Sequence, residues 1–346
     1  MPDAADYIPA FKYGNKLYPQ HLVLPSMPLE DGKVWYVDGD KSTGGGGSTW
    51  ADAFGESDFN GNISALGVGA GDVVYVAGRT MVATDTDPIS YTTNLVINVP
   101  QVSLIGVSRG RTQGGLPQLK VGATTTSPIV EIKAPGVMIA NIGVNGVGGT
   151  GGGIKLTDDG GSTSAAFGWS VLGCHFKNCV GTTATDAGTG GAIHWGSGGG
   201  AWQGLVAGNR FYKNVGDVVL PAGASTIPQD IVIEDNVFSG PAASVDCNIF
   251  VGSGGINGLE IHNNYFPCNP NIGSGSNASF LVLTSCVGLL ADNKFAAQTA
   301  EGVTTEIKFG ATQENLVPTT MFMANNYGEF PTGVGAGLIS GEIFRT

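Results

Sequence analysis

The sequence has little charge and no long apolar run. Only 13% of its residues are charged, against a usual share of roughly 25%, while 42% are hydrophobic. Disordered chains show the opposite balance, so the composition excludes disorder. No apolar stretch approaches the roughly 18–20 residues that a membrane-spanning helix needs. We therefore expect a folded protein without a membrane partner.

Basic residues and paired cysteines are also scarce. The 16 basic residues are outnumbered by 28 acidic ones, which gives a net charge of −12 at pH 7. Proteins that bind nucleic acid normally present a basic surface, so we expect no nucleic-acid partner. The five cysteines are odd in number and include no CxxC pair. This disfavours a disulfide framework or a zinc site, and we expect no cofactor.

Glycine, in contrast, is abundant. It accounts for 57 of the 346 residues, where an average protein has roughly 7%. The glycines follow no three-residue period, which excludes collagen. Together with short β-branched segments such as IVIED and LEIHN, they indicate a chain of strands joined by tight turns.

A four-residue motif that ends in phenylalanine recurs through the second half of the chain. Its copies are GCHF, GNRF, DNVF, NNYF and DNKF, and a degenerate sixth copy reads NNYG. The phenylalanines follow one another at intervals of 27 to 35 residues. Strands at such a period bury their faces by stacking on their neighbours. The repeat therefore predicts an all-β fold, a right-handed single-stranded parallel β-helix of about nine coils.

The repeated residues are expected to form two columns, because stacked coils lie about 4.8 Å apart. Phenylalanines would fill the interior, and asparagines two residues earlier would form a side-chain ladder, since an unpaired buried amide is costly. The phenylalanine column comprises Phe176, Phe211, Phe238, Phe266 and Phe295. The asparagine ladder comprises Asn209, Asn236, Asn264, Asn293 and Asn326. A β-sandwich, the alternative fold, does not explain this recurrence.

Three regions follow from the pattern. Residues 1–33 are rich in tyrosine and proline, which suits an extended arm that lies on a partner or wraps the protein's own body. Residues 34–330 form the β-helix and include an N-terminal cap over residues 34–72. In this cap a helical stretch begins at Thr49, and the segment from Trp50 to Phe59 closes the end of the core. Residues 331–346 form a C-terminal cap or tail.

The segment VWYVDGDKSTGGGGSTWADAFG leads into a GAGD turn and a VVYV strand. It resembles the entry segment of the pectate-lyase-like superfamily of right-handed parallel β-helices, which includes bacteriophage tail spikes. The resemblance extends over roughly residues 34–330 at the level of the fold. The first residues, MPDAADYIPA, look unlike a secretory signal. Both points fit a virion protein that folds in the host cytoplasm and leaves with the particle.

The resemblance implies a structural virion protein of a bacteriophage: a short tail spike, a fibre or a capsid decoration. We expect a homo-oligomer, as a trimer, that contacts other virion proteins through its arm and binds cell-surface polysaccharide. Two alternatives stay open. One is a β-helix enzyme, a polysaccharide hydrolase or lyase, which the short chain disfavours because depolymerising spikes generally have larger bodies. The other is a bacterial adhesin exported by a signal-independent route.

For the enzyme, alignment on the phenylalanines supplies acid–base candidates. It places Glu234 and His262 side by side on adjacent coils, within reach of an ion pair. Asp235 and Asp292 share the next column and lie about 9.6 Å apart, near the roughly 6.5–9.5 Å of inverting glycosidases. These two positions precede the asparagine ladder, where an aspartate also suits a turn. Catalysis therefore competes with a purely structural role.

Two insertions supply candidates for ligand binding. The segment GTTATDAGTGGAIHWGSGGGAWQG, residues 181–204, offers an acid–base group and indole faces for a sugar. Its candidates are Asp186, His194, Trp195 and Trp202. The alternative is that the tryptophans pack on the outer face or on a neighbouring subunit. In residues 157–168, Asp158 and Asp159 suit a hard cation such as calcium or, alternatively, a solvated turn.

Overall fold

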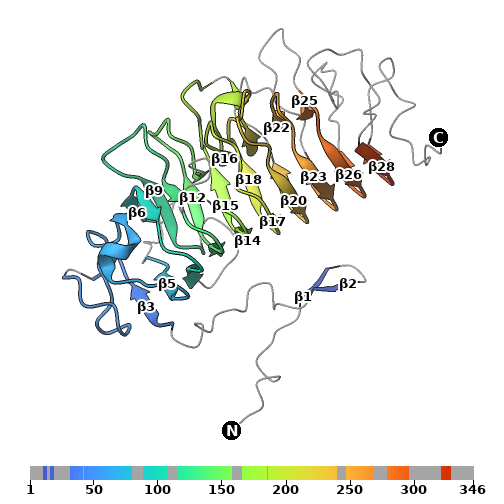
Figure 1. The fold of residues 1–346 in the computed structure, drawn as a ribbon. Coiled ribbons are helices and arrows are strands. Elements are labelled where there is room, and N and C mark those ends of the chain that lie inside the picture. The colour runs from blue at the N-terminus through green and yellow to red at the C-terminus, as the bar shows by residue number, and fades with distance from the viewer. Residues whose placement is uncertain are drawn as a thin grey trace.

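The computed structural model describes residues 32–41, 43–79, 89–107, 115–157, 166–184, 186–239, 247–267, 279–295 and 321–328, together with the backbone of 11–13 and 16–18. Figure 1 shows the body as a stack of short strands that runs from β3 to β28. Within these ranges no α-helix occurs, and no helix is long and apolar enough to cross a membrane.

Three all-parallel sheets make up the body, and from β5 to β27 successive strands enter sheets I, II and III in turn. Sheet I contains β3 (Val34–Val37), β5 (Val73–Ala77), β8 (Ser103–Val107), β11 (Met138–Ala140), β14 (Ser170–Leu172), β17 (Gly204–Ala207), β20 (Gln229–Glu234), β23 (Asn257–His262), β26 (Val287–Ala291) and β28 (Met321–Ala324). Sheet II contains β6 (Ser90–Thr93), β9 (Gln118–Val121), β12 (Gly143–Asn145), β15 (His175–Lys177), β18 (Arg210–Tyr212), β21 (Val237–Ser239), β24 (Tyr265–Phe266), β27 (Lys294–Phe295) and β29 (Tyr327–Gly328). Sheet III contains β4 (Gly61–Asn62), β7 (Leu95–Ile97), β10 (Val130–Ile132), β13 (Ile154–Leu156), β16 (Ile193–Trp195), β19 (Val218–Leu220), β22 (Cys247–Val251) and β25 (Ser279–Leu283).

Each strand inside a sheet pairs in parallel with the strand one coil before it and the strand one coil after it, as in a parallel β-helix, and the usual hand of such crossovers makes the helix right-handed. The predicted fold is therefore confirmed. Within the arm, β1 (Phe11–Tyr13) pairs with β2 (Lys16–Tyr18) as an antiparallel hairpin. The number of coils and the N-terminal cap stay predictions, and residues 331–346 lie outside the described part of the chain.

The repeated phenylalanines form a continuous stack inside the body. From Phe176 to Phe295 successive ring centroids are 5.1, 4.8, 4.6 and 4.7 Å apart, and neighbouring planes differ by 15° at most. Phe280 of β25 meets Phe266 edge-on, with 5.5 Å between centroids. The spacing is that of paired strands, roughly 4.7–4.9 Å, so strand register alone produces the stack.

The asparagines form the expected ladder. Between successive side chains, Nδ2 donates to Oδ1 over 3.0, 3.0, 3.0 and 2.9 Å from Asn209 to Asn326. The same Nδ2 also donates to a strand carbonyl, as Asn264 does to Ile233 O at 2.8 Å. At the head of the ladder, the backbone N of Cys174 donates to Asn209 Oδ1. These bonds satisfy the buried amides, which explains why a polar residue recurs in the core.

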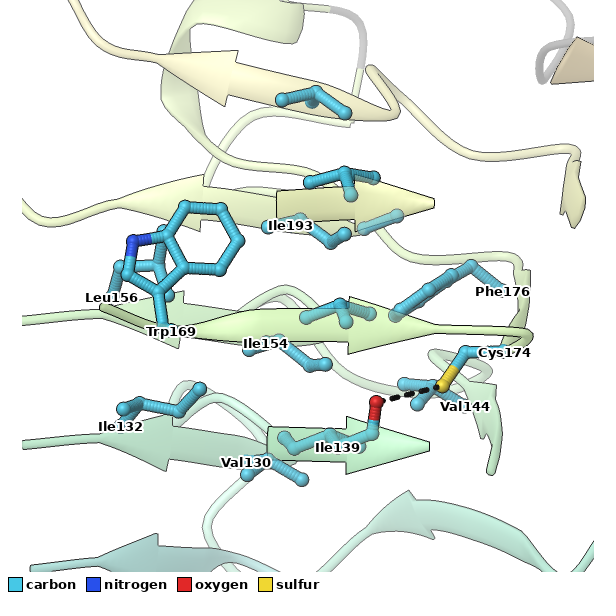
Figure 2. Close-up of a cluster of buried hydrophobic side chains, with 14 of the residues drawn as sticks. Val130, Ile132, Ile139, Val144, Ile154, Leu156, Trp169, Cys174, Phe176 and Ile193 are labelled. Carbon is cyan, nitrogen blue, oxygen red and sulfur yellow. Dashed lines mark hydrogen bonds between the residues drawn. The ribbon is translucent and has the colours of Figure 1, made fainter. Parts of the chain in front are cut away.

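Aliphatic side chains fill the interior beside the aromatic stack. Figure 2 shows layers of Ile132, Leu156 and Ile193 in sheet III beside Ile139 of sheet I. The Cys174 thiol donates to Ile139 O over 3.7 Å. The cysteines that the structure describes are buried thiols: Cys174, Cys179, Cys247 and Cys286. Cys268 lies outside the described residues.

The entry segment differs from the sequence prediction in one respect. No helix begins at Thr49, because the backbone N of Asp52 turns back onto Thr49 and bonds both its carbonyl and its Oγ1. The short 3₁₀ helix η3 lies later, at Ile63–Leu66. Phe54 reaches the first coil through a parallel bridge to Val37, and its ring stacks on the ring of Trp35 at 5.8 Å.

Candidate functional site

Glu234 and His262 lie side by side on sheet I. They are register partners on β20 and β23, and His262 in turn pairs with Ala291 of β26. Glu234 Oε2 is 3.4 Å from His262 Nε2, and each side chain is about one-fifth exposed, at 21%. The spacing of the phenylalanines therefore locates this pair correctly.

The imidazole of His262 is oriented by the residue that follows it. Asn263 Nδ2 lies 3.3 Å from His262 Nδ1. An amide nitrogen only donates, so this contact is a hydrogen bond in the tautomer whose ring proton lies on Nε2, the nitrogen that faces Glu234. A carboxylate and an imidazole in this arrangement can take up and release a proton at the surface of the sheet.

A second carboxylate completes the cluster. Glu260 Oε2 lies 4.0 Å from His262 Nε2, and the Glu260 side chain is half exposed, at 51%. The sequence interpretation missed this residue. Its signal is the strand alternation in LEIH, because residues two apart on a strand share one face. We call Glu234, Glu260 and His262 the acid–base cluster.

Asp235 and Asp292 occupy a turn position that demands an unusual backbone. Both have a φ of 56°, as does Asn263 between them. Left-handed backbone is tolerated by Gly, Asn and Asp, so this column selects the residue type independently of catalysis. The backbone N of Asp235 donates to His262 O and that of Asp292 to Ala324 O. The turn role is thus observed, and a catalytic role for either aspartate stays a prediction.

The glycine-rich segment 181–204 is more ordered than the sequence interpretation expects. Asp186 caps the 3₁₀ helix η4 (Ala187–Thr189) by accepting from Gly188 N. His194 lies on β16, which pairs with β13 and β19. The segment therefore contains a full sheet III strand and ends at Gly204, the first residue of β17.

Trp195 does not face solvent, which corrects its assignment as a ligand-binding residue. Its side chain is 1% exposed. It meets Trp169 edge-on at 5.6 Å, and its Nε1 donates to Gly200 O. The reason is strand alternation, which turns the first and third residues of β16 inward. The outer-face packing considered from sequence is wrong for this residue as well.

His194 points outward from β16 but is covered. Helix η4 packs over the outer side of sheet III, where Ala187 joins a buried cluster with Val215 and Cys247. Burial, reinforced by the nearby Lys155 charge, lowers the pKa of His194 to about 4. A Cβ atom at Gly152 would lie 2.5 Å from the ring, so no space for a ligand exists on that side.

Trp202 is exposed and has an aromatic neighbour. Its side chain is 43% exposed and that of Phe167 is 44% exposed. The two residues precede β17 and β14 at the same place in consecutive coils, where Gly168 N donates to Trp202 O. Trp202 Nε1 donates to Ile227 O at 3.2 Å, which fixes the indole. We call Phe167 and Trp202 the aromatic pair.

The sequence interpretation overlooked Phe167, although the matching segments FGWS and WQGL supply a signal.

The sequence interpretation also overlooked Asp217, a buried carboxylate directly before β19. Asn214 Nδ2 donates to Asp217 Oδ1 at 2.9 Å, and Asn248 Nδ2 donates to Oδ2 at 2.7 Å. Burial nevertheless raises the pKa of Asp217 to about 7.

The predicted calcium ligands Asp158 and Asp159 lie outside the described residues. Elsewhere in the described ranges, no three His, Cys, Asp or Glu side chains gather as a metal site. In comparisons with known proteins, no family model matches the chain. None of the curated proteins matches it either.

Proposed function

We propose that this protein is a glycan-binding structural protein, of the kind that a bacteriophage virion displays as a short tail spike, fibre or capsid decoration. The observation that carries the proposal is the aromatic pair on the surface of the rod. Phe167 and Trp202 repeat at one turn in adjacent coils, with both rings exposed and one of them fixed by a hydrogen bond.

Exposed aromatic rings in a row suit a sugar chain. The apolar face of a pyranose stacks on an aromatic ring, and the hydroxyl groups around it need polar partners. Gln203, Gln229 and Asn257 are exposed at or beside this turn, and Gln203 N donates to Gln229 O across the coils. The surface thus offers both kinds of contact to one glycan.

The proposal of a virion protein rests on the stacked architecture of the β-helix and on the composition of the arm, residues 1–33. Parallel strand pairing through the described coils, with the asparagine ladder from Asn209 to Asn326, suits a protein that must persist outside a cell. Residues 1–33 carry the composition of an attachment segment, and we propose that they join the body to other virion proteins. The trimer and the location on a particle belong to the same proposal.

A glycan-binding assay tests the function. The full chain is applied to an immobilised panel of bacterial surface polysaccharides, beside Trp202→Ala and Phe167→Ala. We expect each variant to bind at least about tenfold more weakly. Phe322→Ala is the matched control, because Phe322 of β28 is also an exposed aromatic residue, at 57%. Unchanged binding by the first two variants would contradict the proposal.

The acid–base cluster supports one other candidate, a polysaccharide-degrading enzyme. Two carboxylates flank one imidazole, and acid–base pairs of this kind cleave glycosidic bonds. The same panel distinguishes the candidates when released reducing ends are measured. Binding without release favours the structural protein. Release that Glu234→Gln and Glu260→Gln abolish favours the enzyme.

A further inference from the structure

A second apolar cluster lies on the outer face of sheet I. Its members alternate along the strands with residues that point into the core, such as Leu104 and Ile139. Register aligns them on neighbouring coils, where Ala140 pairs with Ile105 on one side and with Leu172 on the other. We call this set the outer cluster, and it comprises Val73, Ile105, Met138, Ala140, Leu172 and Ala207, with Tyr75 and Leu205 beside it.

The outer cluster is covered. Its most exposed member, Ala207, is only 9% exposed. Side chains on one face of a sheet stand roughly perpendicular to it, so they cannot hide their own tips from water. A further layer of chain must therefore lie over this face.

The described helices and strands do not supply that layer. The strands of sheet I contact their own sheet neighbours, and η3 and η4 contact strands of sheet III. Trp50 of the entry segment packs on Tyr36 of β3 at the edge of the face, with 4.8 Å between ring centroids. The cover over the middle of the face has to come from elsewhere.

Three short segments outside the described residues adjoin the strands of the outer cluster. Residues 80–88 follow β5, residues 108–114 follow β8, and residues 158–165 precede β14. They read TMVATDTDP, SRGRTQG and DDGGSTSA, in which only Met81 and Val82 are large and apolar. An apolar face needs apolar side chains over it, because polar groups placed there lose their water. The tail after β29 begins at the opposite end of the body.

The arm contains the apolar side chains that these segments lack. Residues 21–29 read HLVLPSMPL and lie outside the described residues. Pro25 and Pro28 favour an extended backbone without a donor, which suits a chain that packs on side chains rather than pairing with the sheet. The apolar side chains of this segment are Leu22, Val23, Leu24, Met27 and Leu29.

The arm also enters the body beside the outer cluster. Lys33 N donates to Asp72 Oδ1 at 2.6 Å, and β3 pairs with β5 at the N-terminal end of sheet I (Figure 1). Sheet I rises from β3 to β17 by five strand spacings, which is about 24 Å. About eight extended residues span this distance at roughly 3.3 Å each. Residues 21–32 are therefore long enough to cross the whole outer cluster.

We propose that residues 21–29, which we call the strap, lie along the outer face of sheet I of the same chain and cover the outer cluster. The cluster is buried within a single chain, which favours this source over a second copy. Residues 1–18, with the hairpin of β1 and β2, are then left to contact other proteins. The arm thus has an inner part that belongs to the body and an outer part that is available for attachment.

Two shortened chains test the proposal. One begins at residue 19 and keeps the strap, and the other begins at residue 34 and lacks it. Denaturant unfolding is measured for both beside the full chain, together with binding of a dye that fluoresces on apolar surface. We expect the chain from residue 19 to match the full chain. The chain from residue 34 should unfold at a lower denaturant concentration and raise the dye fluorescence severalfold.

Substitutions in the full chain avoid the truncation. Leu22→Ser/Leu24→Ser should act like loss of the strap, because it places hydroxyl groups against the apolar face. Leu17→Ser in β2 is the matched control, since it changes an apolar residue of the arm outside the strap, and it should leave both measurements unchanged. Dye fluorescence of the full chain should also stay constant on dilution, because the strap belongs to the same chain.

The proposal is overturned if the chain from residue 34 matches the full chain, which would assign the cover to another segment such as residues 80–88. A loss that is already complete in the chain from residue 19 would contradict it too. Dye fluorescence that rises on dilution would assign the cover to a second copy. Neither measurement involves a glycan or another virion protein, so failure here is distinguishable from failure of the proposed function.

Discussion

At the scale of the residue, a buried polar side chain must replace the hydrogen bonds that it made with water. The buried amides and carboxylates of this protein differ in how far they do so. Asn264 uses both of its Nδ2 protons and accepts two bonds on Oδ1 from Asn236. Asp217 accepts from two side-chain amides, and among the described residues Asn248 Oδ1 next to it has no hydrogen-bond partner. A satisfied amide stabilises the turn, whereas a buried carboxylate with neutral donors costs free energy when it ionises.

Asp217 therefore makes stability depend on pH. Its pKa, raised to about 7 by burial, exceeds the roughly 3.9 of the unfolded chain. Between these values the folded protein holds a proton that the unfolded chain has released, so this contribution to stability is full in acid and is lost as pH rises through 7. Each unit of pKa shift corresponds to about 1.4 kcal/mol.

The substitution Asp217→Asn removes this titration. We expect the free energy of unfolding of the variant, relative to the native chain, to rise between pH 5 and pH 8. Denaturant unfolding at several pH values measures this difference. The low pKa values of His175 and His194 act in both proteins, so they cancel in the comparison. Parallel stability curves would show that Asp217 does not titrate in this range.

At the scale of the element, the sequence predicts the turn between sheets I and II because the same residue types recur there in successive coils. A second position, at or just before the start of seven sheet I strands, has the same left-handed backbone, but its residue types differ: four are glycine, two are glutamine and one is aspartate. Its residues are Gly71, Gln101, Gly136, Gly168, Gln203, Asp230 and Gly258, with φ between 56° and 77°. Glycine occurs throughout this chain and glutamine rarely adopts such a backbone, so the residue types at this position do not reveal the shared conformation.

The wrong prediction that Trp195 binds a ligand has a related cause. Glycines surround the three residues of β16 on both sides, and such composition is typical of a loop. The pairing of β16 with its neighbours, which turns the indole inward, joins residues that are 25 or 39 positions apart in the chain. Composition reports the local surroundings only, so the buried position of Trp195 needed the structure.

The ladder turn provides a matched pair of substitutions. Asn264→Leu removes the acceptor of Asn236 N and Nδ2 and the donor of Ile233 O. We expect a loss of about 3 kcal/mol or more in the free energy of unfolding, since several buried polar groups lose their partners. Asn263→Gly changes the adjacent residue, whose φ of 56° suits glycine, and should cost less than about 1 kcal/mol. Denaturant unfolding compares the two, and equal losses would refute the ladder's contribution.

At the scale of the whole molecule, one stacked core presents three different surfaces. Sheet I carries the acid–base cluster, and the aromatic pair lies at its entry turn. Sheet II carries the exposed Arg210 and Lys294, and η4 covers part of sheet III. Since each coil adds one strand to every sheet, a surface feature extends along the rod by repetition, which suits polymeric ligands more than compact ones.

The last prediction concerns the arm, because removing it distinguishes a protein attached to a particle from a free carbohydrate-binding β-helix. A chain that begins at residue 34 keeps the three sheets and their ladders intact, so we expect it to fold with unchanged circular dichroism. If residues 1–33 attach the protein to other chains, the full protein should be oligomeric and the shortened one monomeric by light scattering. The aromatic pair stays on the body, so glycan affinity per subunit should persist. A monomer in both cases would remove the support for attachment through the arm and favour a free-standing carbohydrate-active β-helix.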